Sequence, residues 1–265
     1  MIKVFEPKLN FKDKISVLKT MQKNFISGTS PTVQEFENEL ASRFDRKYCV
    51  SLSNGSVALD VALQLYDFKK DDEIIVPSFT IISCLSAILR TNATPIFCDV
   101  DINSWNMTVE NIKKVITNNT KAIILVHLYG LVGEVNEIVE YCNENNIIII
   151  EDAAESHGQV AGGKRCGSIG DVSTFSFYAN KHITTGEGGA VLTDNKQQFL
   201  KLRQMVNLDF ESSNRFIHNN LYWNYRLGGL QAALGLSQIK SLEKTITRKI
   251  EQGNYYDQLF SDLSN

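Results

Sequence analysis

The sequence predicts an α/β protein with a mostly parallel sheet and helices on both faces. Two observations lead to this prediction. Seven short runs have the composition of strands, and many are continuously apolar, as expected for strands buried on both faces. Between most of them, apolar residues recur three and four positions apart, and such strand–helix alternation is typical of parallel sheets. The predicted strands are Tyr48–Ser53, Glu73–Val76, Pro95–Asp99, Ala122–His127, Ile147–Glu151, Thr174–Phe177 and Gly189–Thr193.

Two helices are predicted before the first strand, and the second has a recognisable start. Ser30 suits the cap of this helix and Pro31 its first turn, where a backbone N–H is not needed. The other helices lie between strands or follow the last one. The predicted helices are Phe11–Asn24, Pro31–Phe44, Val57–Tyr66, Ile82–Arg90, Val109–Ile116, Val135–Asn143, Asn195–Val206 and Gly228–Tyr256.

Composition excludes several classes of protein. The 265 residues are 43% hydrophobic, which suits one large or two small soluble domains. A net charge of -3 argues against nucleic-acid binding, which usually needs a basic surface. The longest apolar run, near Ile147–Ile150, is too short to span a membrane. The start shows no signal-peptide hydrophobic region, and the five cysteines are scattered, so we expect reduced thiols in a cytoplasmic protein without a metal site.

Three groups of polar residues follow predicted strands, where ligands bind in open α/β sheets. The first is Ser53-Asn54-Gly55-Ser56, between a strand and a helix. Free backbone N–H groups and the helix dipole favour a phosphate at such a position. An ordinary helix cap with a tight turn explains this segment equally well.

The second group is Glu151-Asp152-Ala153-Ala154-Glu155, directly after an apolar strand. Carboxylates at the end of a buried strand need a cation, a metal or hydrogen-bond donors. A protonated pyridine nitrogen would meet one of them, whereas a solvated strand end capped by Asp152 is the alternative.

The third group is Lys181, which follows the strand Thr174–Phe177 and precedes the glycine-rich turn Gly186-Glu187-Gly188-Gly189. A partly desolvated lysine loses proton affinity and becomes a nucleophile that can form a Schiff base. Most single lysines are surface charges, so this interpretation depends on the neighbouring groups.

Together these segments resemble the DegT/DnrJ/EryC1/StrS family of sugar aminotransferases, and perosamine-synthase-like members most closely. The resemblance covers almost the whole chain in family order. The matching stretches are SNGSVALDVAL, VPSFTIIS, VHLYG, EDAAESHG, GSIGDVSTFSFYANKHITTGEGGAVLTD and WNYRLGGLQAALGLSQI. The resemblance implies the aspartate-aminotransferase fold, which is fold type I of pyridoxal-phosphate (PLP) enzymes. It divides the chain into an N-terminal segment (1–30), a PLP-binding large domain (31–240) and the start of a C-terminal helical region (241–265).

The resemblance also implies a role for each matching residue. Lys181 carries PLP as a Schiff base and shuttles a proton, and Asp152 keeps the pyridine nitrogen protonated, which makes the ring an electron sink. Glu155 lies near the ring face and its hydroxyl. Four further residues bind the phosphate, the last of them in the neighbouring subunit of a homodimer with shared active sites. These four residues are Gly55, Ser56, Ser176 and Asn224.

The implied reaction transfers an amino group, with glutamate as the expected donor, to the keto group of a nucleotide-linked 4-keto-6-deoxy sugar. Surface-polysaccharide synthesis is the implied setting. Two departures from the family pattern stand out. Ile81 occupies a position that is often aromatic and stacks on the cofactor ring. Family members also continue into a small C-terminal domain that closes over the site, and we expect this chain to lack it.

Three alternatives remain at this point. A PLP-dependent sugar dehydratase carries histidine in place of the lysine, and Lys181 argues against it. A PLP-binding fragment with little or no turnover would fit a chain without the small domain. A plain nucleotide-binding α/β domain predicts no bound chromophore and no role for Lys181.

Overall fold

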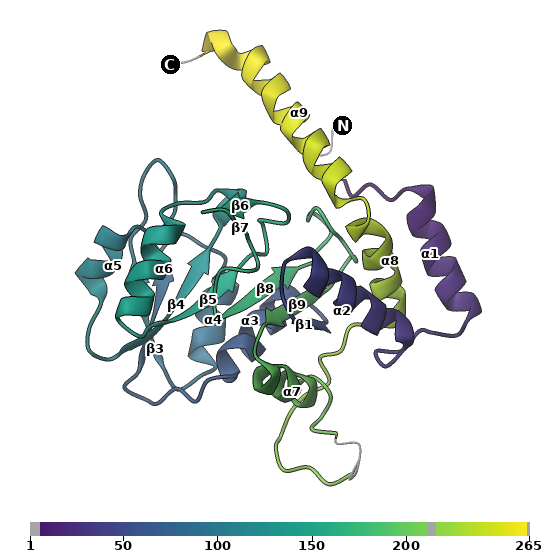
Figure 1. Cartoon of the computed structure of the whole chain (residues 1–265), viewed down its shortest axis with the longest axis horizontal. Coiled ribbons are helices and arrows are strands. Elements are labelled where there is room, and N and C mark those ends of the chain that lie inside the picture. The colour runs from purple at the N-terminus through teal and green to yellow at the C-terminus, as the bar shows by residue number, and fades with distance from the viewer. Residues whose placement is uncertain (1–5, 211–215, 264–265) are drawn as a thin grey trace.

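The computed structural model describes residues 6–210 and 216–263, and its centre is a seven-stranded sheet (Figure 1). The strands lie in the order β1-β9-β8-β5-β4-β2-β3. All seven strands predicted from the apolar runs are present, with bounds within a few residues of those expected. The strands are β1 Tyr48–Leu52, β2 Glu73–Pro77, β3 Thr94–Cys98, β4 Thr120–Val126, β5 Ile148–Asp152, β8 Val172–Ser176 and β9 Gly189–Thr193.

The sheet is mostly parallel, as predicted. Strands β2–β3, β2–β4, β4–β5 and β5–β8 pair in parallel, whereas β9 is antiparallel to both β1 and β8. Because β9 runs against both of its neighbours, β1 and β8 point the same way. The carboxyl ends of β1, β2, β4, β5 and β8 therefore meet at one edge of the sheet, where the expected site residues follow.

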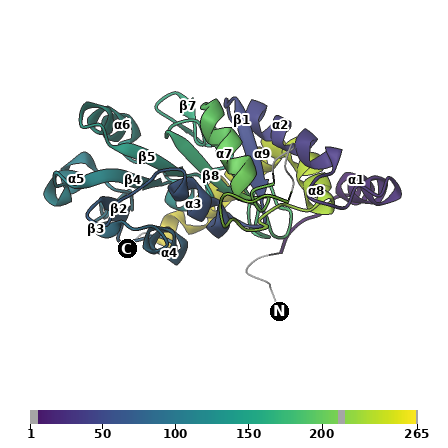
Figure 2. The ribbon, with the colours of Figure 1, turned by 90° about the horizontal axis from the view of Figure 1, so that it is seen from below.

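Helices cover both faces of the sheet (Figure 2). One face buries Ile74 and Val76 against α3, α4 and α7, and the other buries Ile75 against α5 and α6. Alternate residues of β2 thus enter different cores, which explains why the strand is apolar throughout. A third cluster packs α2 and α8 against β1, β8 and β9. These helices are α2 Pro31–Arg43, α3 Gly55–Gln64, α4 Ile82–Leu89, α5 Val109–Val115, α6 Val135–Glu144, α7 Lys196–Met205 and α8 Gly229–Ile239.

The N-terminal helix α1 (Phe11–Gln22) is fixed to α8 through a buried carboxylate. Asp13 accepts hydrogen bonds from Ser237 Oγ (2.7 Å) and Gln238 Nε2 (3.3 Å). The same side chain accepts from the backbone N–H of the cap residue Asn10, so one carboxylate both caps α1 and anchors it. The prediction of a helix in this segment is confirmed, although the helix ends at Gln22.

Residues Gly228–Tyr256 form two helices, so the prediction of one long helix from Gly228 was wrong. Helix α8 ends at Ile239 and α9 spans Leu242–Phe260. Between them, Ser241 has φ -107° and ψ 5°, outside the helical range. The buried Leu242, together with Gln238 through its hydrogen bond to Asp13, holds this junction against the rest of the protein. Helix α9 extends away from the sheet (Figure 1).

Smaller elements complete the fold. The strands β6 (Val160–Ala161) and β7 (Lys164–Arg165) form a short hairpin that the sequence patterns did not predict. Single 3₁₀ turns, η1 and η2, occupy Leu128–Gly130 and Ser261–Leu263. Within the described ranges, every helix is too short or too polar to cross a bilayer.

Candidate active site

A cavity of about 920 Å³ lies at the edge where the carboxyl ends of the parallel strands meet. Helices α3 and α4, turn η1 and the segments after β5 and β8 all contribute to its wall. The structure therefore brings together all but one of the expected site residues. The expected residues that line the cavity are Gly55, Ser56, Asp152, Glu155, Ser176 and Lys181.

The N-terminus of α3 forms one end of the cavity. Asn54 caps the helix, and its Oδ1 accepts a hydrogen bond from the backbone N–H of Val57 (2.9 Å). The N–H groups of the first helical turn have no carbonyl partner inside a helix, so those of Gly55 and Ser56 are placed to donate to an anion. A Cβ added to Gly55 would lie 2.7 Å from the Cβ of Ser176. Glycine is therefore required for α3 to approach the end of β8 this closely.

Three hydroxyl groups surround this helix end. Ser56 Oγ and Ser83 Oγ lie 2.6 Å apart, and Ser176 Oγ accepts from the backbone N–H of Tyr178 (3.3 Å). All three serines line the cavity. Ser83 was not predicted, because on α4 it is close to Ser56 only in space. Backbone N–H groups and hydroxyls around a helix N-terminus make a suitable donor set for a phosphate.

Lys181 forms an ion pair inside the cavity. Its Nζ lies 2.9 Å from Glu155 Oε1, and its side chain is 14% exposed. The other oxygen of Glu155 accepts from the backbone N–H of Tyr129 (2.8 Å). Tyr129 has a left-handed backbone with φ 54°, an uncommon conformation for a residue other than glycine. Turn η1 thus fixes the carboxylate of Glu155, and this carboxylate holds Lys181.

Asp152 is a buried carboxyl group without a cationic partner. In the part of the chain that the structure describes, it forms no ion pair, and its hydrogen-bond donors are the Ala154 N–H (3.1 Å) and the Cys84 thiol (3.4 Å). Burial raises the pKa of Asp152, whereas its hydrogen bonds and the Lys181 charge act in the opposite direction. A buried carboxylate in this state favours a nearby cation with an N–H to donate.

These features fit PLP. The unpaired carboxyl of Asp152 suits a protonated pyridine nitrogen, and the first turn of α3 with its serines suits a phosphate. Lys181 faces the same cavity with an amine that can be attached to an aldehyde. Ile81 also lines the cavity and is 58% exposed, so it offers packing surface but no aromatic ring.

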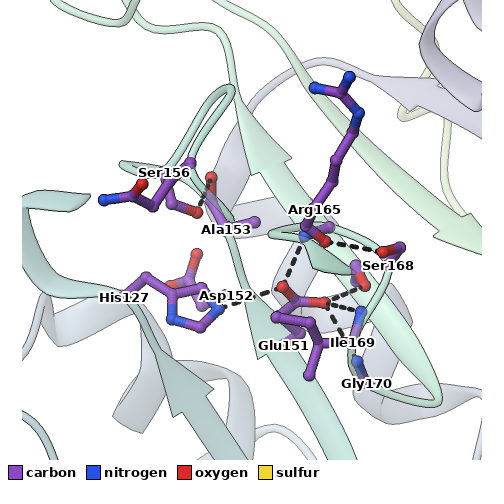
Figure 3. Close-up of polar contacts among 12 residues, drawn as sticks. His127, Glu151, Asp152, Ala153, Ser156, Arg165, Ser168, Ile169 and Gly170 are labelled. Carbon is purple, nitrogen blue, oxygen red and sulfur yellow. Dashed lines mark hydrogen bonds and ion pairs between the residues drawn. The ribbon is translucent and has the colours of Figure 1, made fainter. Parts of the chain in front are cut away.

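Glu151, the residue next to Asp152, has a different environment (Figure 3). Its carboxylate accepts hydrogen bonds from His127 Nε2 (3.1 Å) and Ser173 Oγ (2.7 Å). It also accepts from backbone N–H groups of the loop before β8, those of Gly167, Ile169 and Gly170. Burial would raise the pKa of Glu151, but these donors and the charge of His127 outweigh it and lower that pKa. Glu151 is therefore the anchor of this loop.

His127, Glu151 and Cys166 bring their ligand atoms within 4.8 Å of one another. The scattered positions of these residues in the sequence gave no sign of this grouping. Burial lowers the pKa of His127, but the nearby Cys166 thiol and the hydrogen bond and charge of Glu151 raise it well above its usual value. A protonated imidazole beside a carboxylate that already accepts N–H donors forms an ion pair rather than a set of metal ligands.

An aromatic cluster lies at the rim of the cavity. The ring centroids of Phe79 and Trp105, and those of Trp105 and Tyr129, are each 6.0 Å apart in edge-on geometry. Phe79 and Tyr129 line the cavity and are exposed. Trp105, like Tyr129, has a left-handed backbone (φ 55°). The cluster was not predicted from the sequence, since its members come from three separate segments of the chain.

Asn224 does not line the cavity. It is exposed, and its Oδ1 accepts a hydrogen bond from Arg226 Nε (2.8 Å). Its backbone pairs with Asn207 in an isolated bridge, and the neighbouring Tyr225 O accepts from Ser53 N–H (2.8 Å). Asn224, an expected phosphate ligand, thus lies near the end of β1 but outside the cavity formed by the residues of its own chain.

Comparison with known proteins identifies the family. The model described as the DegT/DnrJ/EryC1/StrS aminotransferase family matches residues 8–265. GDP-perosamine synthase from Escherichia coli O157:H7 is 39% identical over 262 residues, which are 99% of this chain and 72% of that protein. The expected resemblance is confirmed.

Solved structures agree. The aminotransferase TlmJ from Streptoalloteichus hindustanus superposes with a TM-score of 0.94 at 27% identity, covering 98% of this chain and 72% of that one. The E. coli GDP-4-keto-6-deoxy-D-mannose-3-dehydratase with bound hydrated PLP gives a TM-score of 0.91 at 26% identity, covering 97% and 72%. The expected PLP-enzyme fold is confirmed, and the chain belongs to the DegT/DnrJ/EryC1/StrS aminotransferase family.

Proposed function

We propose that this chain is a PLP-dependent aminotransferase that transfers an amino group to the keto group of a nucleotide-linked 4-keto-6-deoxy sugar. One observation carries the proposal. Lys181, the unpaired carboxyl of Asp152 and the N-terminus of α3 face a single cavity, and their chemistry matches the aldehyde, the ring nitrogen and the phosphate of PLP. A family assignment over residues 8–265 supports the same enzyme class.

When bound, PLP supplies an electron sink for the carbon that loses or gains a proton. The residues of the chain hold it and move that proton. Asp152 would accept the ring N–H and keep the nitrogen protonated, while the N–H groups of Gly55 and Ser56, together with the Ser176 hydroxyl, would hold the phosphate. Lys181 would hold the cofactor until the amino group of a substrate displaced it, and the freed amine would then move a proton between the substrate carbon and the cofactor carbon. Glu155, which bonds Lys181 Nζ, orients this amine.

The substrate class follows from the relatives. Three proteins named GDP-perosamine synthase are 34–39% identical to this chain. A relative named for a dTDP-linked keto sugar is 31% identical. We infer a nucleotide-linked sugar as acceptor, with GDP as the nucleotide to test first, and glutamate as donor. The reaction would then serve surface-polysaccharide synthesis, including the O-antigen of lipopolysaccharide, in the cytoplasm.

A homodimer with shared sites completes the proposal. Asn224 is exposed next to the end of β1 and outside the cavity of its own chain, a position that suits contact with the phosphate site of a second copy. Sedimentation of the full chain tests the dimer, and a monomer at all concentrations would contradict it. In a dimer, substitution of Asn224 by alanine should weaken PLP binding although the residue lies outside its own chain's cavity.

Visible absorbance tests the enzyme class. The full chain is titrated with PLP beside Lys181→Ala and the matched control Lys121→Ala, which removes an exposed lysine near the start of β4, at the opposite edge of the sheet. We expect the band of a protein-bound Schiff base, shifted from that of free PLP, in the unmodified chain and the control but not in Lys181→Ala. Glutamate should bleach the band, and a GDP-linked 4-keto-6-deoxy sugar should restore it.

Each alternative predicts another result. A Lys181-dependent band that ignores glutamate would support a cofactor-binding protein without turnover. A band that survives in Lys181→Ala, or no band in any variant, would overturn the proposal. Restoration by a dTDP-linked sugar but not by a GDP-linked one would change the nucleotide and keep the reaction class.

A further inference from the structure

A short chain of hydrogen bonds ends on Asp152. Thr80 Oγ1 lies 3.4 Å from Cys84 Sγ, and Cys84 Sγ lies 3.4 Å from Asp152 Oδ2. An ionised carboxylate can only accept, so the single thiol hydrogen of Cys84 points to Asp152. The sulfur then accepts from the Thr80 hydroxyl. Thr80, just before α4, and Cys84, in its first turn, thus connect to the carboxyl group that faces the cofactor site.

Cys84 remains a neutral thiol in this position. It is fully buried, and burial, followed by the negative charge of Asp152, raises its pKa well above the usual range. A thiol in this state is neither a nucleophile nor a metal ligand. Its available chemistry is to donate one weak hydrogen bond.

We propose that Cys84 is a positioning residue for the reaction: its thiol fixes the orientation of Asp152 while leaving the carboxylate basic enough to hold the proton on the cofactor's ring nitrogen. The proposal rests on the function proposed above. Each donor to a carboxylate stabilises its charge and weakens it as a base, and an S–H donates less strongly than an O–H. A thiol therefore orients the carboxylate of Asp152 and lowers its basicity less than a hydroxyl would.

Cys84 is the side chain that is placed to orient Asp152. Within the described residues, Cys84 provides the one side-chain hydrogen bond to Asp152, and the other donor is the backbone N–H of Ala154. The further ionisable groups that act on Asp152 are Lys181 and Glu155, which pair with each other at 2.9 Å and act in opposite directions. Substitution of Cys84 therefore changes the hydrogen bonding of Asp152 and leaves the ion pair of Lys181 with Glu155 in place.

The test compares Cys84→Ala and Cys84→Ser with Cys142→Ala, which removes another fully buried thiol from α6, on the opposite face of the sheet. PLP affinity is measured from the Lys181-dependent visible band. Protonation of the ring nitrogen is followed by ¹⁵N NMR of PLP labelled at that atom, as a function of pH. The second readout reports on Asp152 and does not depend on turnover.

We expect Cys84→Ala to bind PLP about five- to tenfold more weakly, as for the loss of one hydrogen bond. Cys84→Ser should recover the affinity, because the hydroxyl restores the donor. Its ring nitrogen should lose the proton at a pH lower by roughly half a unit to one unit, because the stronger donor makes the carboxylate less basic. Cys142→Ala should match the unmodified chain in both measurements.

An unchanged ring-nitrogen titration in Cys84→Ser would overturn the proposal, as would an equal loss of affinity in Cys142→Ala. If Cys84→Ala fails to fold, Cys84→Ser alone carries the test through its pH shift. Failure of the proposed function looks different, since the unmodified chain would then show no Lys181-dependent band.

Discussion

The small size of Gly55 allows the cofactor site to form. A Cβ at this position would lie 2.7 Å from Ser176 Cβ and 3.1 Å from Ser176 Oγ. We expect Gly55→Ala to push the first turn of α3 away from β8 and to weaken PLP binding by about tenfold or more, since phosphate donors then lose their alignment. Titration of the visible band measures this affinity.

Gly253→Ala is the matched control for this change. Gly253 lies in α9, and a Cβ there would meet no atom within 4 Å. In this control, alanine should leave PLP binding unchanged and slightly stabilise the helix. Equal affinities in Gly55→Ala and the unmodified chain would show that the close approach to Ser176 is not needed for the phosphate.

Most of the site residues were predictable because each follows a strand. Asp152 comes at the end of β5, and Lys181 follows β8 by a few residues. The sequence could not separate Glu151 from Asp152, since both are carboxylates at one strand end. Consecutive strand residues point to opposite faces, so Asp152 lines the cavity and Glu151 enters a ring of donors. Cys84 gave no signal, because its contact with Asp152 spans 68 positions of sequence.

At the scale of elements, Glu151 joins β4, β5 and the loop before β8. Its carboxylate binds His127 and three loop amides. We expect Glu151→Gln to destabilise the fold by about 3 kcal/mol, because it leaves a buried charged histidine without its counter-charge. The loss is measured by urea unfolding, and hydrogen exchange should show early opening at Gly167, Ile169 and Gly170.

Glu110→Gln is a suitable control, because Glu110 pairs with Lys113 on the exposed surface of α5. Such a pair contributes little to stability, so urea unfolding should hardly change. An equally small effect of Glu151→Gln would contradict the anchoring role and would leave the loop held by its backbone contacts alone.

The elements themselves were predictable where the signal is local. Short strand-like runs predicted all seven strands of the main sheet, and many of these runs are continuously apolar because both faces of the sheet are covered. The antiparallel insertion of β9 between β1 and β8 was not predictable, since the pairing of β9 with β1 joins residues more than 100 positions apart. The break at Ser241 was equally hidden, because neither glycine nor proline marks it and the apolar pattern continues. The domain bounds at residues 30 and 240 stay predictions.

At the scale of the whole molecule, the buried ion pair of His127 and Glu151 sets how stability depends on pH. The pKa of Glu151 is lowered by folding, so its contribution is complete above the usual glutamate pKa of about 4.3 and is lost as pH falls below it. The pKa of His127 is raised by folding. Its contribution is present below the usual histidine pKa and is lost as pH rises through the raised value.

Asp60 and Asp152 oppose this trend on the acid side. Burial raises the pKa of both carboxyl groups, so the folded chain gains protons at these positions before the unfolded chain does. Their contribution to the stability of the cofactor-free chain therefore increases as pH falls, which partly hides the loss at Glu151. The unmodified chain and Glu151→Gln both contain Asp60 and Asp152, so the difference between their free energies of unfolding at each pH does not include this contribution.

We therefore expect the free energy of unfolding of the unmodified chain to exceed that of Glu151→Gln by about 3 kcal/mol near pH 6. The gap should narrow as pH falls from about 4.3 to about 2, because the unfolded chain then binds a proton at Glu151 that the folded chain binds only near pH 2, whereas glutamine binds none. Urea unfolding of both chains across this range measures the gap. A gap that stays constant with pH would mean that Glu151 stabilises the fold through its neutral hydrogen bonds, and the ion pair with His127 would then contribute nothing to the acid limit of this protein.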